Sequence, residues 1–239
     1  MKNKPSVFVA LFALDERDGW FTPAIAQFLV SLSNAKSRAL CLQVKVNTKP
    51  IDYARNCIVR DFLASGFDWL LCIDNDMAPP PNLLDMLDRA QEHMSILAPK
   101  FHLFATCLQK QAKNSNLPLT IGWQPLEKPP GENEWCELAW CGTGVVFIHR
   151  RVFERMGKQD WFRFIYGDDG VMVNSEDVNF FQKARRLGFS AWGNQEFEAD
   201  HFKTVSLSAL ARSIGTMVPT PLTVLRQKGV SVTGEAPQE

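Results

Sequence analysis

Two short apolar runs constrain the fold of this chain more than any other feature of its sequence. Ser6–Leu14 and Trp69–Ile73 are almost continuously apolar, and an acidic segment follows each of them directly. A run this short is typical of a strand that is buried on both faces, as in a sheet covered by helices on either side. A chain of 239 residues is long enough to bury such a core without disulfide bonds or metal ions to stabilise it.

Helical patterns alternate with further strand patterns along the chain. Thr22-Pro23 begins a helix that extends to about Ser33, because Pro is favoured at the first helical position. Asp52–Ser65 repeats apolar residues at spacings of three and four, and Gly66 ends that helix. The other expected elements are strands at Leu40–Val46, Ile96–Ala98 and Gly144–His149 and helices at Asn82–Gln91, Arg151–Met156 and Ser175–Leu187. This alternation predicts an α/β fold with a mainly parallel sheet and helices on both faces.

The domain boundaries and the compartment follow from weaker patterns. Residues 105–140 contain several prolines and show no periodicity, so we expect loops or a hairpin there, and no linker divides the chain. We therefore expect one domain over residues 1–212 and a C-terminal extension over residues 213–239. Asp15-Glu16 stands where a signal peptide would have its cleavage site, and no apolar run is long enough for a transmembrane helix. The expected location is the cytoplasm.

Charge and cysteine content narrow the class of protein further. Lys and Arg together number 26, as do Asp and Glu, so the chain lacks the strong basic field of a duplex-DNA binder. A nucleic-acid partner is therefore not expected. The 6 cysteines include no Cys-x-x-Cys pair, and Cys57 and Cys72 lie within apolar segments. We expect reduced, buried thiols rather than a disulfide framework.

The strongest chemical signal is Asp74-Asn75-Asp76, which follows the apolar run Trp69–Ile73 directly. In open α/β sheets, ligands bind outside the carboxyl ends of the strands, which is where these two carboxylates would lie. Mg²⁺ or Mn²⁺ bound with a nucleotide takes one or two protein carboxylates, because phosphate oxygens and water complete its shell. The alternative is an acidic turn that binds nothing, since Asp and Asn are common turn residues.

Two helices carry further candidates, each with a structural alternative. Arg55 and Asn56 fall off the apolar stripe of their helix, so Arg55 is either a ligand for a diphosphate or base, or part of a solvated face. Ser175-Glu176-Asp177 opens a helix, where one carboxylate could accept a proton from a hydroxyl as a general base. The helix dipole favours acidic residues at this position in any case.

Two later segments complete the set of candidates. Trp140 precedes Gly142-Thr143-Gly144, where an aromatic ring could stack on a sugar and the glycines would let the backbone approach a ligand closely. The same glycines are equally consistent with a bulge or a tight turn. His201 lies among acidic residues near the end of the patterned sequence.

Taken in order, these segments resemble the nucleotide-sugar-dependent glycosyltransferases of the GT-A fold, in particular compact bacterial and phage members. The resemblance covers residues 5–208 and rests on the acidic loop after the first strand, Ala54-Arg55-Asn56, Ile73-Asp74-Asn75-Asp76, Gly142-Thr143-Gly144, Ser175-Glu176-Asp177 and His201-Phe202-Lys203. It implies a GT-A-like, Rossmann-like domain in the cytoplasm of a bacterial or phage-infected cell. The implied reaction moves a sugar from a nucleotide-diphosphate sugar, of the UDP or GDP type, to a hydroxyl on a glycan, lipid or protein.

The resemblance also implies a role for each matched residue. Asp74 and Asp76 would hold Mn²⁺ or Mg²⁺ against the donor diphosphate, and His201 would be a further metal ligand. Asp177 would be the general base, with Glu176 as the next candidate. The donor contacts would come from Asn75, Arg55, Lys203 and the loop of Phe12, Ala13, Leu14 and Glu16, which departs from the family's Pro-containing polar loop. The acceptor side would be formed by Trp140, Gly142, Thr143 and Gly144.

Two rival functions remain at this stage. A haloacid-dehalogenase-like phosphatase also uses Asp-x-Asp after a strand, and Gly167-Asp168-Asp169 imitates its later acidic motif. That motif normally ends the first strand of the fold, whereas here the expected strand comes third. The other rival is a sugar- or nucleotide-binding protein without catalysis.

Overall fold

The computed structural model describes residues 4–13, 23–35, 37–104, 121–123, 135–158 and 160–202. The chain divides into two units, one comprising Met1–Leu103 with Trp123–Phe202 and the other Phe104–Gly122 with Lys203–Glu239. Nearly all described residues belong to the first unit, which contains the candidate site. The C-terminal extension expected over residues 213–239 lies outside the described residues.

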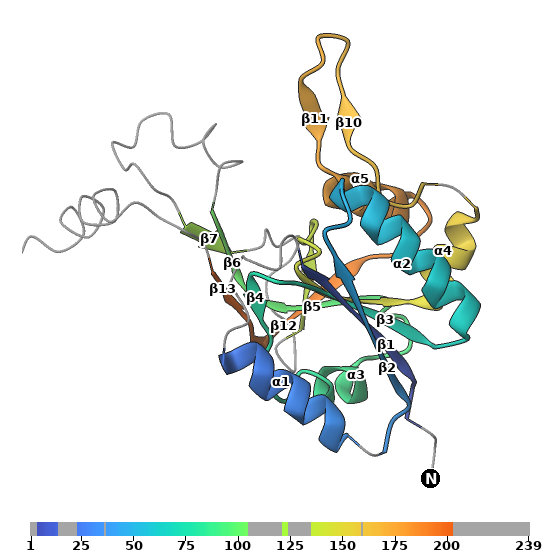
Figure 1. Ribbon diagram of the computed structural model, residues 1–239. Coiled ribbons are helices and arrows are strands. Elements are labelled where there is room, and N and C mark those ends of the chain that lie inside the picture. The colour runs from blue at the N-terminus through green and yellow to red at the C-terminus, as the bar shows by residue number, and fades with distance from the viewer. Residues whose placement is uncertain are drawn as a thin grey trace, which may run out of the picture. The chain divides into compact units, whose positions relative to one another are not determined.

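The described residues form thirteen strands and five helices (Figure 1). The helices are α1 (Pro23–Asn34), α2 (Ile51–Ser65), α3 (Asp85–Arg89), α4 (Arg150–Met156) and α5 (Glu176–Arg186). The strands are β1 (Val7–Ala13), β2 (Leu40–Val46), β3 (Trp69–Asp74), β4 (Met77–Ala78), β5 (Ile96–Lys100), β6 (His102–Phe104), β7 (Ile121–Trp123), β8 (Trp135–Leu138), β9 (Val145–His149), β10 (Ile165–Tyr166), β11 (Met172–Asn174), β12 (Ala191–Glu198) and β13 (Asp200–His201).

Seven of these strands form the central sheet, in the order β2-β1-β3-β9-β5-β12-β8. β2, β1 and β3 pair in parallel, and β5 pairs in parallel with β12. β9 lies antiparallel between β3 and β5, and β8 is antiparallel to β12 at the edge. Five of the seven strands therefore run in one direction, which confirms the predicted α/β fold with a mainly parallel sheet. The shorter pairs β10-β11, β13-β4 and β6-β7 form separate sheets.

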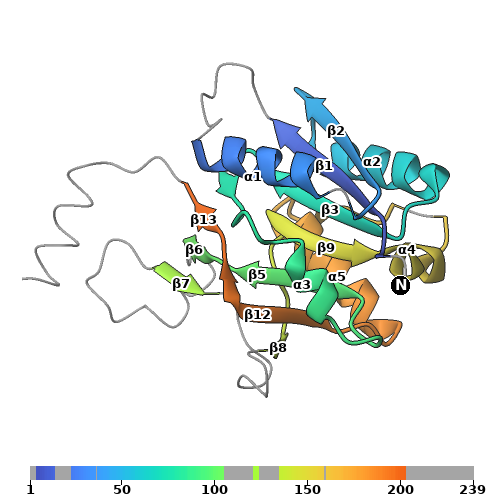
Figure 2. The same cartoon turned by 90° about the horizontal axis from the view of Figure 1, so that it is seen from below.

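The central sheet separates two hydrophobic cores, and β1 contributes to both. Val7 and Leu11 belong to the core that contains α1 and α3, whereas Phe8 and Phe12 belong to the core that contains α2, α4 and α5. This division follows from the strand itself, because successive side chains point to opposite faces of a sheet. Figures 1 and 2 show the two sets of helices on opposite faces of the sheet.

Parts of the element prediction are wrong, and β12, a strand of the central sheet, was not expected at all. The helix expected over Asn82–Gln91 occupies only Asp85–Arg89, because turns with hydrogen bonds from residue i+3 to residue i precede it, such as Leu83 N–H to the Pro80 carbonyl. Within the segment expected to form loops or a hairpin, β8 is instead a strand of the central sheet, where antiparallel pairing with β12 holds its short sequence.

A short hairpin formed by β10 and β11 precedes α5. Its turn is closed by the N–H of Gly170, which donates to the Gly167 carbonyl at 2.9 Å, and by the N–H of Val171, which donates to Asp169 Oδ1 at 3.0 Å. Gly170 has a φ of +74°, in the left-handed region that favours glycine. The acidic motif Gly167-Asp168-Asp169 therefore builds a turn.

The five described cysteines are free thiols, and three of them are buried, whereas Cys41 and Cys57, which were also expected to be buried, are only half-buried. Burial raises the pKa of the Cys72 thiol to about 12 and that of Cys141 well above its usual range, so both are uncharged. Among the described residues, no helix combines the length and the hydropathy needed to cross a membrane.

The core under α2 gives a direct test of this packing. Phe62 is fully buried, and its ring meets the rings of Phe8 and Phe153 edge-to-face, with centroids 6.0 Å apart in each pair. Phe62→Ala should lower the free energy of unfolding by about 3–5 kcal/mol, because it leaves a cavity among rings. Tyr53→Ala on the same helix, where the side chain is 53% exposed, should change it by less than about 0.5 kcal/mol. Urea unfolding followed by circular dichroism measures both, and equal losses would contradict the packing described.

Candidate functional site

The pairing of two short strands brings Asp76 and His201 together. β4 pairs antiparallel with β13, with His201 opposite Met77, and the N–H of Phe202 donates to the Asp76 carbonyl at 2.8 Å. This ladder sets His201 Nε2 3.3 Å from Asp76 Oδ2. Both side chains are partly accessible, at 12% exposed for His201 and 23% for Asp76. The structure thus joins two of the three expected metal ligands.

The orientation of the His201 ring is set by its other nitrogen. Nδ1 lies 2.8 Å from the carbonyl oxygen of His102, which can only accept, so Nδ1 carries a hydrogen. Nε2 therefore faces Asp76 in one of two states. An imidazolium would donate from Nε2 to the carboxylate, whereas a neutral ring would present a lone pair there, which suits a bound cation or a water molecule.

Asp74, the third expected ligand, is held by Arg55. Arg55 Nη2 lies 2.9 Å from both Asp74 oxygens, and Arg55 Nη1 lies 2.5 Å from Glu176 Oε1. The guanidinium is buried, with 3% of the side chain exposed, and lies 5.4 Å above the centre of the Phe12 ring. Burial disfavours its charge, but Asp74 and Glu176 outweigh that effect and raise the pKa of Arg55.

The expectation that Arg55 lies off the apolar stripe of its helix is wrong. Val59 is buried as completely as Ile58, which widens the buried stripe of α2 to include position 55. Asn56 does lie outside the buried stripe, and its half-buried side-chain amide bonds to both the N–H and the carbonyl of Phe162. Asn56 Nδ2 donates to the Phe162 carbonyl at 2.7 Å, and the Phe162 N–H donates to Asn56 Oδ1 at 3.0 Å.

The two carboxylates at the start of α5 have different surroundings. Glu176 is buried against Arg55, and burial raises its pKa, although Arg55 opposes the shift. Asp177 is half-buried, and its Oδ1 accepts from the hydroxyl of Ser175 and, at 2.7 Å, from the N–H of Val178. Ser175 makes no side-chain cap of its own, so Asp177 supplies a carboxylate at this helix start.

The glycine segment before β9 lies between the two acidic groups. The N–H of Asp74 donates to the Gly144 carbonyl at 2.8 Å. A Cβ placed on Gly144 would lie 3.7 Å from Asp74 Oδ2, and one on Gly142 would lie 3.9 Å from Asp177 Oδ2. Gly144 is also crowded by Met77, whose Cγ would lie 3.1 Å from such a Cβ. The segment therefore joins the Asp74 side of the site to the Asp177 side.

The remaining expected site residues are placed as follows. Thr143 is buried, and Trp140 packs partly buried against the core under α2. Phe12 is buried in that same core, and the carbonyl of Ala13 accepts from the N–H of Asn47 at 2.9 Å. Asn75 lies half-buried in the turn between β3 and β4. Leu14, Glu16 and Lys203 lie outside the described residues.

The described side chains can be compared with what a metal centre requires. Within the described ranges, no group of three or more His, Cys, Asp and Glu side chains is arranged to hold a metal ion. Asp76 and His201 are the two ligand-type groups that face each other, while both oxygens of Asp74 contact Arg55. A cation that takes two protein ligands and completes its shell with phosphate and water fits this set.

No family model matches the sequence, and no curated protein matches it. Among solved structures, A197 from STIV is similar over 83% of this chain and 86% of that chain, with 16% sequence identity and a TM-score of 0.53. GalNAc-T7, crystallised with UDP, GalNAc and Mn²⁺, is similar over 90% of this chain, with 10% identity and a TM-score of 0.50. The match covers 48% of GalNAc-T7, so this chain spans about half of that protein's length. A glycosyltransferase involved in the glycosylation of the major capsid of PBCV-1 matches at 11% identity over 90% of this chain and 100% of that chain, with a TM-score of 0.44.

At these sequence identities the likeness concerns the fold. The fold of this chain, a mixed seven-stranded sheet with helices on both faces, is similar to the fold of GalNAc-T7. The resemblance drawn from the short motifs is confirmed at this level: the chain has a GT-A-like fold.

The buried ion pairs of Arg55 predict a large stability effect. Arg55→Met should lower the free energy of unfolding by about 3–5 kcal/mol at neutral pH, because Asp74 and Glu176 lose the cation that they share. Arg60→Met on the same helix, at an exposed position, should cost less than about 0.5 kcal/mol. Urea unfolding compares the two variants, and a similar small loss in both would place Arg55 on a solvated face.

The same variant has a predictable pH dependence. An acid whose pKa is raised by folding stabilises the protein below the pKa of the unfolded chain, and that contribution is lost as pH rises through the folded pKa. The pKa of Glu176 is raised already and should rise further without Arg55. Arg55→Met should therefore recover stability relative to the parent when pH falls from about 7 to about 5. The double variant Arg55→Met/Glu176→Gln should lose most of this recovery, since it has no acid at position 176.

Proposed function

We propose that this protein is a metal-dependent glycosyltransferase that moves a sugar from a nucleotide-diphosphate sugar to a hydroxyl-bearing acceptor. The observation that carries the proposal is the Asp76–His201 pair beside Asp74, at the carboxyl end of β3. Ligands of α/β sheets bind at this edge. GalNAc-T7, which shares the fold, was crystallised with UDP, GalNAc and Mn²⁺ at 10% identity to this chain.

The donor side of the proposed site is built from Asp76, His201 and Asp74. Asp76 and His201 would hold Mn²⁺ or Mg²⁺, and Asp74 would face the same ion from the Arg55 side. When bound, the cation would neutralise charge on the leaving diphosphate. Arg55 has a positioning role, because it fixes the Asp74 carboxylate from within the core. Asn75 and the segment that begins at Ala13 are assigned to the nucleotide.

The acceptor side would use Asp177 as the general base. Asp177 Oδ1 already accepts two hydrogen bonds, so Oδ2, on the side of Gly142, would take the proton of the acceptor hydroxyl. Glu176 suits this role less well, because it is buried and contacts Arg55. Trp140 and the Gly142–Gly144 segment would border the acceptor.

The phosphatase alternative finds no support in the structure. Asp168 and Asp169, which imitate its later motif, are exposed in the β10-β11 turn, where Asp169 accepts a backbone hydrogen bond. An experiment distinguishes the glycosyltransferase from a binding protein without catalysis, because release of nucleoside diphosphate from a nucleotide sugar excludes the binding protein. Release of phosphate from phosphomonoesters, without any activity on nucleotide sugars, would favour the phosphatase.

The metal assignment predicts a matched pair of binding results. Asp76→Ala and His201→Ala should each remove the Mn²⁺-dependent part of the affinity for UDP or GDP, since each removes one of two protein ligands. Asp200→Ala changes an exposed carboxylate of the same strand and should leave that affinity unchanged. Calorimetric titration of both nucleotides, with and without Mn²⁺, measures these effects. An unaltered metal response in Asp76→Ala would show that the site is elsewhere.

The assignment of the base predicts a separation of turnover from stability. Asp177→Asn should lower turnover by roughly 10²–10⁴-fold, because an amide cannot accept the proton of the acceptor. Its stability should change by about 1 kcal/mol or less, since the amide oxygen still accepts at the helix start. Glu176→Gln should behave in the opposite way, with altered stability and a milder effect on turnover. Nucleoside-diphosphate release and thermal unfolding give the two readouts, and an inactive Glu176→Gln beside an active Asp177→Asn would exchange the roles.

A further inference from the structure

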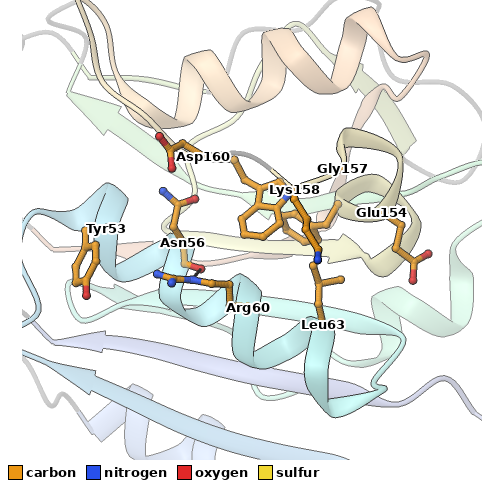
Figure 3. A pocket seen from close by; sticks show the side chains of 10 residues that line it. Tyr53, Asn56, Arg60, Leu63, Glu154, Gly157, Lys158 and Asp160 are labelled. Atoms are coloured by element: carbon orange, nitrogen blue, oxygen red, sulfur yellow. Dashed lines mark hydrogen bonds between the residues drawn. The ribbon is translucent and has the colours of Figure 1, made fainter.

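A cavity of about 720 Å³ lies between α2, α4 and the loop that follows α4 (Figure 3). It is separate from the proposed catalytic site, because none of its ten lining residues is an expected metal, donor, acceptor or catalytic residue. Its volume falls in the range of sites that hold small organic ligands. The residues that matter most are Arg60 and Leu63 of α2, Glu154 of α4, and Gly157, Lys158 and Trp161 beyond it.

The inner part of the cavity is apolar, with one polar group that lacks a partner. Leu63, Phe153 and Trp161 line it, and Phe153 and Trp161 meet edge-to-face with ring centroids 6.2 Å apart. The indole N–H of Trp161 is buried and has no acceptor among the described residues. Gly157, with a φ of +75°, keeps one side open, because a Cβ built on it would meet nothing within 4 Å.

The rim of the cavity carries two cations without carboxylate partners. Among the described residues, the hydrogen bonds of Arg60 go to the Asn56 carbonyl, at 3.4 Å, and to the Cys57 thiol, at 3.2 Å. In the described part of the chain, neither Arg60 nor Lys158 has a carboxylate within ion-pair distance, and both side chains are exposed. Figure 3 shows both cations beside the cavity.

Each of the two acidic residues at the rim has another cation nearby. Glu154 lies 3.7 Å from Arg150, one helical turn away. Lys183 donates to the backbone carbonyl of Asp160 at 2.7 Å, and the charge of the Asp160 carboxylate acts on the same ammonium. Arg60 and Lys158 are therefore the two rim cations available to an anion above the apolar interior.

We propose that this cavity is a second ligand site and binds an amphipathic anion. The ligand would place an apolar ring system or a short acyl chain against Leu63 and Trp161, and a carboxylate, sulfate or phosphate against Arg60 and Lys158. The apolar interior supplies the area removed from water, and the guanidinium supplies paired donors for an oxyanion. The site depends on neither the metal nor the sugar donor.

Two dyes that differ by one charged group test the proposal. 8-Anilinonaphthalene-1-sulfonate has an aromatic body and a sulfonate, and N-phenyl-1-naphthylamine has the same rings without the charge. The parent protein should bind the sulfonate dye more tightly than the neutral dye in fluorescence titrations. Arg60→Glu/Lys158→Glu should weaken the affinity for the sulfonate dye by about tenfold or more and leave the affinity for the neutral dye nearly unchanged. The reason is that only the contact with the anion is lost.

The matched control is Arg155→Glu/Arg186→Glu, which makes the same change in net charge at two exposed positions outside the cavity. It should bind both dyes as the parent does, and circular dichroism confirms that each variant is folded. If both double variants lose the same affinity for the sulfonate dye, the effect comes from the change in net charge, and the proposal is overturned. The proposal also fails if the parent binds the neutral dye as tightly as the sulfonate dye. Neither result bears on the glycosyltransferase proposal, which is tested with UDP, GDP and Mn²⁺.

Discussion

The buried guanidinium of Arg55 is the interaction on which the candidate site depends. It joins α2 to the end of β3 through Asp74 and to the start of α5 through Glu176, a contact between residues 121 positions apart in the sequence. A buried charge of this kind is tolerated only when its partners are fixed, since losing one partner leaves the others uncompensated. Arg55 thereby holds three elements together at the carboxyl end of β3, and Phe12 packs beneath the guanidinium.

In this small set of residues, some side chains hold the site in place and others are accessible to a ligand. Arg55, Glu176 and Asn56 are engaged with the protein itself, through ion pairs or through the backbone of Phe162. Asp76 and Asp177, in contrast, each keep part of their carboxylate on the accessible side. Rigid support behind a partly solvated group is what a precise binding site requires, because the supporting contacts limit how far its geometry can drift.

Sequence patterns predicted the parts of the fold that are decided locally. The run Trp69–Ile73 is β3, and Gly66 ends α2 with a φ of +80°, as the pattern indicates. The burial of Arg55 was not predictable in this way, because it depends on carboxylates that arrive from β3 and α5. β8 was missed for a similar reason: four residues carry too little periodicity, and only the pairing with β12 makes them a strand. The proximity of Asp76 and His201 agrees with the motif order, whereas their roles and those of Asp177 and Lys203 remain predictions.

The antiparallel strand β9 in the middle of the sheet has a consequence for synthesis of the chain. β1, β2 and β3 are complete once residue 74 has been made, but the free edge of β3 is covered only by β9, at residues 145–149. Ribosomes add about 5–20 residues per second, so this edge stays open for several seconds while the intervening chain emerges. An uncovered apolar strand edge invites pairing with other chains. Arg55 and Asp74 are both made before this interval and Glu176 only after it, so the complete set of Arg55 ion pairs can form only once the start of α5 has been made.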